Sequence, residues 1–300
     1  MTRVLLLLCC AFAVYLRPLS AAEPQPLWPA SAPGETAPLP PETDTTNESH
    51  NRVAGRAVIR LGNVSTPTLT LCKAPKENDT GVTIVVFPGG GYSIVAYDLE
   101  GTEVCEWLNA HGINAVLVKY RVPRRPGLQP HTAALQDAQR AVGLVRHRAA
   151  ELGLDPTRIG ALGFSAGGHL VATLSNQYRR RTYPVIDDAD RASCRPDFSV
   201  LIYPAYLTDK EKQNALVPEL SVSKQTPPTF LVMTQDDPVR VENAVYYYLA
   251  LKRAAVPAEL HVYPKGGHGY GLRRTENPAT VWPELLVRWL ETGGWLESRP

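Results

Sequence analysis

The chain has 300 residues, of which 44% are hydrophobic and 20% are charged. This globular composition excludes a wholly disordered chain, and the length suffices for one large α/β domain without disulfide stabilisation. Lysine and arginine total 31 against 29 acidic residues, and such a near-neutral balance argues against a protein that binds nucleic acid by charge.

The first 22 residues have the three parts of a secretory signal peptide. Arg3 precedes an apolar run over 4–16, and the small residues Ser20 and Ala22 follow it. The run is short for a membrane span, so an uncleaved anchor is the weaker alternative. We therefore expect cleavage near Ala22, a secreted or periplasmic mature protein, and no stable membrane partner.

Residues 23–50 contain seven prolines in 28 positions, with threonine, glutamate and serine among the rest. This composition does not favour a packed core and predicts an extended, proline-rich linker or N-terminal strap. A single domain is expected to cover residues 51–300.

Three cysteines remain after the predicted cleavage, namely Cys72, Cys105 and Cys194. An odd number without C-x-x-C spacing predicts neither a metal knot nor a disulfide framework, and leaves one bridge or free thiols open. The sequence contains no H-E-x-x-H motif, and the histidines at 111, 131 and 147 lack close ligand spacing. We therefore expect no metal and no cofactor.

From residue 56 onward, apolar runs of strand length alternate with helical patterns. The predicted strands cover 68–71, 82–87, 115–120, 158–164, 198–203, 229–234 and 259–263. The predicted helices cover 101–111, 132–152, 242–255 and 281–291. Repeated strand–helix–strand units imply a mostly parallel central sheet with helices on both faces. Ligands of such sheets bind beyond the carboxyl ends of the strands, so the segments directly after the strands are the candidate site.

A run of three glycines, Gly89 to Gly91, follows the strand at 82–87. Consecutive glycines allow backbone N–H groups to face a site without obstruction by side chains. The run matches neither G-x-x-x-x-G-K-[ST] nor G-x-G-x-x-G, which argues against a phosphate-binding loop. We predict that Gly90 and Gly91 donate to an oxyanion, with a plain β-turn as the alternative.

The pentapeptide at 163–167, GFSAG, matches G-x-S-x-G between a predicted strand and a helical stretch. In this context the serine occupies a strained turn that exposes its hydroxyl above the sheet edge, beside a helix N-terminus. The pentapeptide alone occurs by chance, but the context makes Ser165 the predicted nucleophile. The N–H of Ala166 is the predicted third oxyanion donor.

A serine nucleophile needs a histidine base held by a carboxylate, in the chain order Ser, Asp or Glu, His. His268 lies in a glycine-rich loop after the last predicted strand, whereas each other histidine is explained as a linker, helix or strand residue. Asp236 and Asp237 both follow the strand at 229–234. The D-x-x-V spacing to Val239 favours Asp236, although turn geometry decides between the two.

These motifs resemble those of secreted α/β-hydrolase esterases, and above all the acetyl xylan esterase-like enzymes, some of which are labelled xylanase B. The resemblance rests on PGGGY, GFSAGG, DDPV and GGHGYG at the strand ends, and on segments at 27–34, 64–69 and 137–141. It covers nearly the whole mature chain and implies an α/β-hydrolase fold with Ser165, Asp236 and His268 as the triad. Pro88 departs from the histidine that many related lipases carry there, which leaves the anchoring of that loop open.

The resemblance implies hydrolysis of small acyl esters, with acetyl groups on xylan or related carbohydrates as the expected substrate. The partner is then an acylated polysaccharide or a small ester. Tyr92 and Tyr270 flank the site loops and could stack on a sugar or pack beneath the loops. Residues 207–226 are polar and lysine-bearing, and predict a short lid or rim.

Two other functions are compatible with the same residues. A serine peptidase or amidase uses every part named above, but such enzymes usually carry a propeller or cap domain that a 28-residue linker cannot supply. A non-catalytic carbohydrate-binding pseudo-hydrolase is the second alternative, and an intact triad argues against it. A glycosidase would need two carboxylates flanking the sugar bond rather than a serine.

Overall fold

The β-branched run at 83–87 forms a strand whose five residues are all buried, because both faces of the sheet are covered there. The structure is a computed structural model that describes residues 22–35, 38–49 and 52–296. The predicted signal peptide, apart from Ala22, lies outside these residues. Among the described helices, none combines the length and the apolar character needed to cross a membrane.

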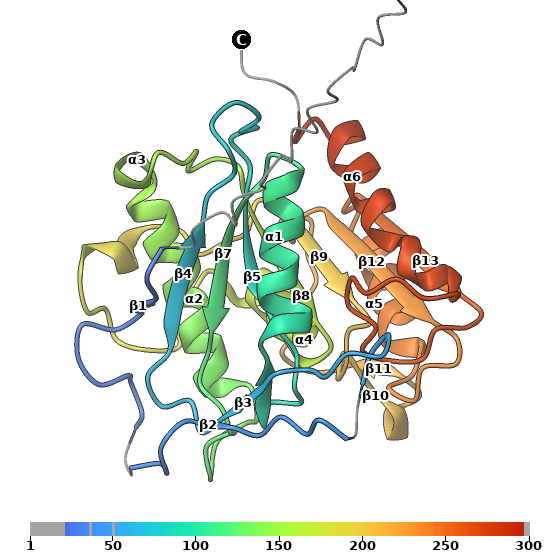
Figure 1. Ribbon diagram of the computed structural model, residues 1–300, viewed down its shortest axis with the longest axis horizontal. Helices are drawn as coiled ribbons and strands as arrows, with labels where there is room; N and C mark the ends of the chain where they lie inside the picture. The colour runs from blue at the N-terminus through green and yellow to red at the C-terminus, as the bar shows by residue number, and fades with distance from the viewer. Residues whose placement is uncertain (1–21, 36–37, 50–51, 297–300) are drawn as a thin grey trace, which may run out of the picture.

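Eight strands form one central sheet in the spatial order β1-β4-β7-β5-β8-β9-β12-β13 (Figure 1). From β7 to β13 every neighbouring pair is parallel, whereas β4 and β1 add antiparallel strands at one edge. The strands are β1 Gln25–Pro26, β4 Thr68–Cys72, β7 Asn114–Lys119, β5 Thr83–Phe87, β8 Ile159–Phe164, β9 Ser199–Ile202, β12 Thr229–Thr234 and β13 Ala258–Tyr263. The predicted mostly parallel sheet is confirmed.

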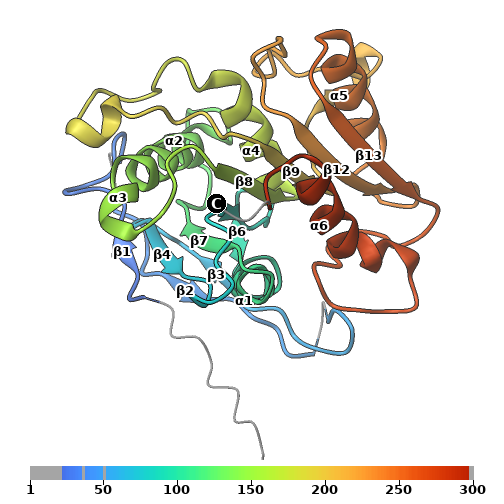
Figure 2. The ribbon, with the colours of Figure 1, turned by 90° about the horizontal axis from the view of Figure 1, so that it is seen from above.

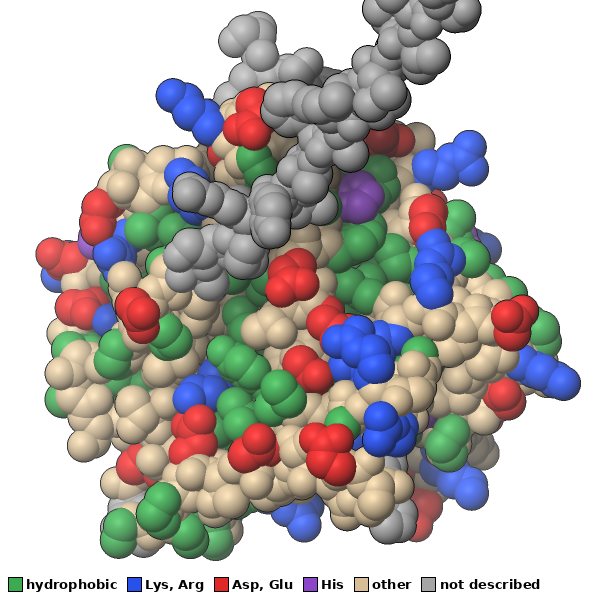
Figure 3. Space-filling view, viewed as in Figure 1, with side chains coloured by type: hydrophobic (Ala, Val, Ile, Leu, Met, Phe, Trp, Pro, Cys, Tyr) green, Lys and Arg blue, Asp and Glu red, His purple; other side chains and the backbone are tan. Residues whose placement is uncertain are grey.

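Helices cover both faces of this sheet, as predicted (Figure 2). Helices α1 and α6 lie on one face, and α2, α3, α4 and α5 lie on the other. Their bounds are α1 Glu103–Ala110, α2 Thr132–His147, α3 Ala149–Leu152, α4 Ala166–Gln177, α5 Glu242–Arg253 and α6 Trp282–Thr292. On the face that carries α1 and α6, acidic and basic side chains are interspersed, consistent with the near-neutral total charge (Figure 3).

Short elements complete the described chain. A three-stranded sheet joins β2 Thr43–Asp44, β3 Arg60–Gly62 and β6 Ile94–Ala96, and a hairpin joins β10 Thr208–Asp209 and β11 Ala215–Leu216. One turn of π-helix at Asp98–Thr102 precedes α1, and 3₁₀ turns form at Asp188–Arg191, Lys210–Lys212 and Pro278–Val281. The three described cysteines are free thiols.

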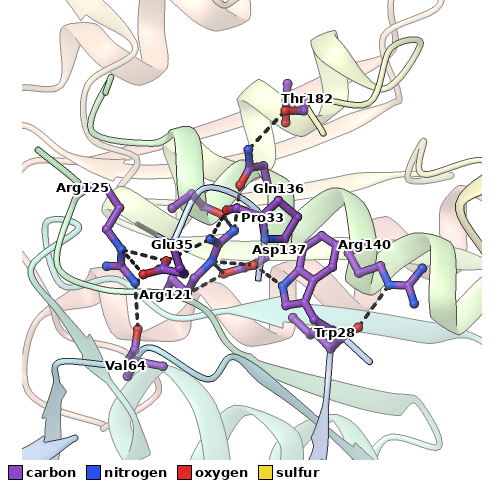
Figure 4. A network of polar contacts seen from close by, with 12 residues as sticks. Trp28, Pro33, Glu35, Val64, Arg121, Arg125, Gln136, Asp137, Arg140 and Thr182 are labelled. Carbon is purple, nitrogen blue, oxygen red and sulfur yellow. Dashed lines mark hydrogen bonds and ion pairs between the residues drawn. The ribbon is translucent and has the colours of Figure 1, made fainter. Parts of the chain in front are cut away.

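The proline-rich segment, predicted as an extended linker or N-terminal strap, contributes two large side chains of its first part to the core. Leu27 and Trp28 are only 1% and 5% exposed, directly after β1 pairs with β4. The Trp28 indole N–H donates to Asp137 Oδ1 at 2.8 Å (Figure 4). Prolines limit the conformations of this segment but leave its two large apolar side chains free to be buried.

A buried ion pair holds the same segment to the body of the protein. Arg121 Nε lies 3.0 Å from both oxygens of Asp137, and Arg121 Nη1 donates to the Pro33 carbonyl and to Glu35 (Figure 4). Burial raises the pKa of the Asp137 carboxyl, although the Arg121 charge and hydrogen bonds oppose that shift. The segment therefore acts as a strap whose anchors lie on α2 and on the loop after β7.

The segment at 207–226, predicted as a lid or rim, is packed onto α5. Leu207 and Leu220 are buried, and the Leu207 and Thr208 N–H groups donate to Asn243 Oδ1 at 2.9 and 3.0 Å. These contacts attach the segment to α5, which is the arrangement expected of a rim.

Candidate active site

Three loops that follow β8, β12 and β13 meet at the carboxyl edge of the sheet. They carry Ser165, Asp237 and His268, respectively. Since β8, β9, β12 and β13 are consecutive parallel strands, residues that directly follow them emerge at the same edge. The topology thus brings together residues more than 100 positions apart in the chain.

The turn between β8 and α4 exposes the Ser165 hydroxyl. Ser165 has φ 51° and ψ −118°, a strained backbone conformation for a residue with a side chain. A Cβ atom on Gly163 would overlap the Gly167 carbonyl, and one on Gly167 would overlap the Phe87 carbonyl. The two glycines of G-x-S-x-G are therefore required by close backbone approach on both sides of the serine.

His268 bridges the serine and an aspartate. Its Nε2 lies 2.8 Å from Ser165 Oγ, and its Nδ1 lies 2.7 Å from Asp237 Oδ2. The Asp237 side chain is fully buried, whereas that of His268 is 24% exposed. An ionised carboxylate only accepts hydrogen bonds, so Asp237 fixes the imidazole with its proton on Nδ1 and leaves Nε2 to accept the serine proton.

The structure corrects the choice of Asp236, because Asp237 is the aspartate that faces His268. Asp237 Oδ1 accepts the Val239 N–H at 2.6 Å, which closes a tight turn. This turn directs Asp237 Oδ2 toward the imidazole of His268. Asp236 instead accepts the N–H groups of Gly266 and Gly267 at 3.3 and 2.9 Å, which lowers the pKa of its carboxyl. Asp236 thus holds the loop that carries the histidine.

The glycine loop after β5 presents two N–H groups beside the serine. Gly90 has φ 131° and Gly91 has φ 64°, and both line the same cleft as Ser165. Within the described residues, the N–H groups of Gly90, Gly91 and Ala166 donate to no other group of the chain. Unused backbone donors beside a nucleophile are what an oxyanion hole requires.

Glu100 and Tyr120 anchor the glycine loop, in which Pro88 stands where many related lipases carry a histidine. The Gly89 N–H donates to Glu100 Oε2 at 2.7 Å, and the Tyr120 hydroxyl donates to the Pro88 carbonyl at 2.5 Å. Glu100 Oε1 also accepts the Tyr203 hydroxyl at 2.8 Å. Burial raises the pKa of the Glu100 carboxyl, and these two hydrogen bonds oppose the shift. No motif in the sequence indicates these partners, because each comes from a different element.

The cleft above the serine has a volume of about 510 Å³. Gly90, Gly91, Ser165, Tyr206 and His268 are among the residues that line it. This volume lies within the ordinary range for small-molecule sites. The cleft is therefore large enough for the acyl group of an ester, and for part of the ester's alcohol, beside Ser165 and His268.

Tyr206, rather than the two tyrosines considered from the sequence, offers an exposed aromatic ring. Tyr92 and Tyr270 are only 2% and 4% exposed and pack beneath the loops, so their rings are not available to a ligand. Tyr206 is 49% exposed, and its ring stacks on that of Tyr92 with centroids 6.3 Å apart. It follows β9, where no sequence motif marks it.

Comparison with known proteins places this geometry in a family. Residues 84–223 match the family described as alpha/beta hydrolase fold. The chain is 32% identical over 255 residues to an acetylxylan esterase of Xylanibacter ruminicola, covering 77% of this chain and 48% of that protein. It is 28% identical over 211 residues to endo-1,4-beta-xylanase B of Butyrivibrio fibrisolvens, covering 64% of this chain and 33% of that protein. The chain thus spans half or less of these two relatives.

A solved structure matches along nearly its whole length. The crystal structure of an acetyl ester-xyloside bifunctional hydrolase from Caldicellulosiruptor lactoaceticus is 33% identical, with a TM-score of 0.72. The match covers 91% of this chain and 97% of that chain. On the sheet topology, the serine turn and these matches, the chain belongs to the α/β-hydrolase fold family.

Proposed function

We propose that this protein is a serine carboxylic ester hydrolase that removes small acyl groups, chiefly acetyl, from xylan or a related carbohydrate. The observation that carries the proposal is the unbroken series of contacts from Asp237 through His268 to Ser165, beside unused N–H donors. The similarity to proteins named acetylxylan esterase and acetyl ester-xyloside hydrolase supports the substrate class.

In the acylation step, Ser165 Oγ attacks the ester carbonyl carbon while His268 Nε2 takes the hydroxyl proton. The carbonyl oxygen becomes negative, and the N–H groups of Gly90, Gly91 and Ala166 stabilise it. The intermediate then expels the sugar hydroxyl as an alcohol that takes the proton from His268. An acyl-serine remains.

In the deacylation step, water takes the place of the sugar. His268 Nε2 removes a proton from the water as its oxygen attacks the acyl carbon, and the same proton then returns to Ser165 Oγ. The acid, acetate for an acetyl ester, leaves and the serine is regenerated. Asp237 remains ionised throughout and stabilises the imidazolium in both steps.

We also propose that the protein is exported, with an acylated polysaccharide as its partner outside the cytoplasm. The leader-like residues 1–22 support this localisation. N-terminal sequencing of the exported protein should identify a first residue near Glu23. Exported protein that still begins at Met1 would contradict the proposed cleavage.

The experiment that tests the proposed activity compares three substrates with wild type and Ser165→Ala. Acetate release from acetylated xylan, ferulate release from feruloyl esters and cleavage of peptide amides are measured at equal enzyme concentration. We expect wild type to act best on acetylated xylan and Ser165→Ala to lose that activity by about 10⁶-fold. Preferred cleavage of the amides would favour the peptidase, and no turnover of any substrate would favour the pseudo-hydrolase.

A further inference from the structure

Three side chains with metal-ligating atoms converge beside the catalytic loops but outside the triad. His131 precedes α2, His169 lies on α4, and Glu219 lies on the rim segment after β11. One ligand atom from each lies within 4.8 Å of the others. His169 Nε2 is 3.2 Å and His131 Nδ1 is 3.5 Å from Glu219 Oε1. The group is invisible in the sequence, since Glu219 is 50 residues from His169.

A buried tyrosine fixes the orientation of one imidazole. The Tyr92 hydroxyl lies 2.7 Å from His169 Nδ1, and Tyr92 is only 2% exposed. A histidine that binds a metal usually uses its second ring nitrogen in a hydrogen bond that sets the ring orientation. Tyr92 occupies that position and leaves His169 Nε2 directed at Glu219.

Burial and charge at this group also favour a cation. The His131, His169 and Glu219 side chains are 12%, 3% and 20% exposed. Among the described residues, no lysine or arginine forms an ion pair with Glu219.

We propose that His131, His169 and Glu219 form a zinc-binding site that ties the rim segment to α2 and α4. Two imidazoles and one carboxylate are a common ligand set of Zn²⁺, with a water in the fourth position. Tetrahedral bonds of about 2.0–2.1 Å place neighbouring ligand atoms about 3.3 Å apart, close to the two separations to Glu219. Imidazole nitrogen disfavours Mg²⁺ and Ca²⁺, which prefer oxygen ligands.

Calorimetric titration of the chelator-treated full chain with zinc sulfate alone tests the proposal. We expect one zinc ion per chain at this site, and a cobalt(II) complex with the visible absorption of a tetrahedral N/O site. His131→Ala and Glu219→Gln each remove a ligand and should weaken zinc binding by more than about 100-fold, whereas Tyr92→Phe should weaken it by about 10–100-fold. Zinc should raise the melting temperature of wild type and not of the first two variants.

His261→Ala is the matched control, because His261 Nε2 lies 2.6 Å from Glu259 Oε1 in a half-exposed histidine–glutamate pair on β13. This variant should bind zinc as wild type does. His268→Ala tests whether zinc binds at the triad histidine instead. This variant should bind zinc as wild type does. No uptake by wild type, unchanged uptake by His131→Ala and Glu219→Gln, or loss of uptake in His261→Ala would overturn the proposal. Because the two ligand variants alter different segments, a folding defect in one leaves the other as the test.

Discussion

Adjacent aspartates after β12 take different positions because one tight turn separates their side chains. Asp237 accepts the Val239 N–H with one oxygen and faces His268 with the other, in a fully buried position. Asp236 is exposed and accepts the backbone N–H groups of the histidine loop. One aspartate therefore fixes the imidazole itself, and its neighbour fixes the loop that carries it.

Replacing each aspartate with asparagine separates these two contributions. Asp237→Asn should lower kcat for p-nitrophenyl acetate by about 10⁴-fold, because an amide that donates to Nδ1 favours the wrong imidazole tautomer. Asp236→Asn should cause a far smaller loss, since its remaining carbonyl oxygen still accepts a loop N–H. Steady-state kinetics on the two variants decide the assignment. A larger loss in Asp236→Asn would reverse it.

Glu100 should make stability depend on pH. Its pKa in the folded protein lies above the ordinary value of 4.5, chiefly because of burial. Between these two values the folded state binds more protons than the unfolded state, so stability falls as pH rises through that window. Glu100→Gln, which keeps an acceptor for the Gly89 N–H, should show a shallower fall.

Urea unfolding of both proteins, from pH 4.5 upward through neutral pH, measures that difference. Exposed Glu151 offers a control: its pKa in the folded protein is lowered from the ordinary value of 4.5, so Glu151→Gln should leave the slope above pH 4.5 unchanged. Identical pH dependence in wild type and Glu100→Gln would contradict the account of a buried carboxylate at the oxyanion loop.

At the scale of elements, the N-terminal strap depends on a few contacts with α2. Trp28→Phe keeps most of the buried ring but removes the hydrogen bond to Asp137, a buried acid. We expect a loss of about 2 kcal/mol in the free energy of unfolding, measured in urea. Trp107→Phe is the control, because the Trp107 indole N–H has no partner within the described residues, and its loss should be smaller. Equal losses would mean that the Asp137 bond adds nothing.

Tyr206, which directly precedes the rim segment, should contribute to recognition of polymeric substrates. Tyr206 lines the cleft with an exposed ring, so Tyr206→Ala should raise KM for acetylated xylo-oligosaccharides by on the order of tenfold, about 1.4 kcal/mol. KM for p-nitrophenyl acetate should rise much less, because this ester carries no sugar ring that could stack on Tyr206. Tyr246→Ala, on α5, is the exposed control. A parallel rise for both substrates would contradict a role in sugar binding.

At the scale of the whole molecule, local patterns predicted the sheet, Ser165 and His268. The alternation of strands and helices, and the glycines around the serine, are visible within short stretches of sequence. What depends on contacts distant in sequence could not be predicted. The choice between Asp236 and Asp237 needed the turn geometry, and burial of Trp28 depends on an aspartate 109 residues away. Nothing in the sequence around Glu100 indicates its contact with the glycine loop, because that contact forms only in the folded protein.

Covalent labelling by a fluorophosphonate tests whether Ser165 is the nucleophile; mass spectrometry locates the label, and acetate release from acetylated xylan measures the remaining activity. We expect one label per chain, on the peptide that contains Ser165, and acetate release that falls in proportion to labelling. Asp237→Asn should react more slowly and Ser165→Ala not at all. A label on another residue, or full acetate release from fully labelled protein, would show that Ser165 is not the nucleophile.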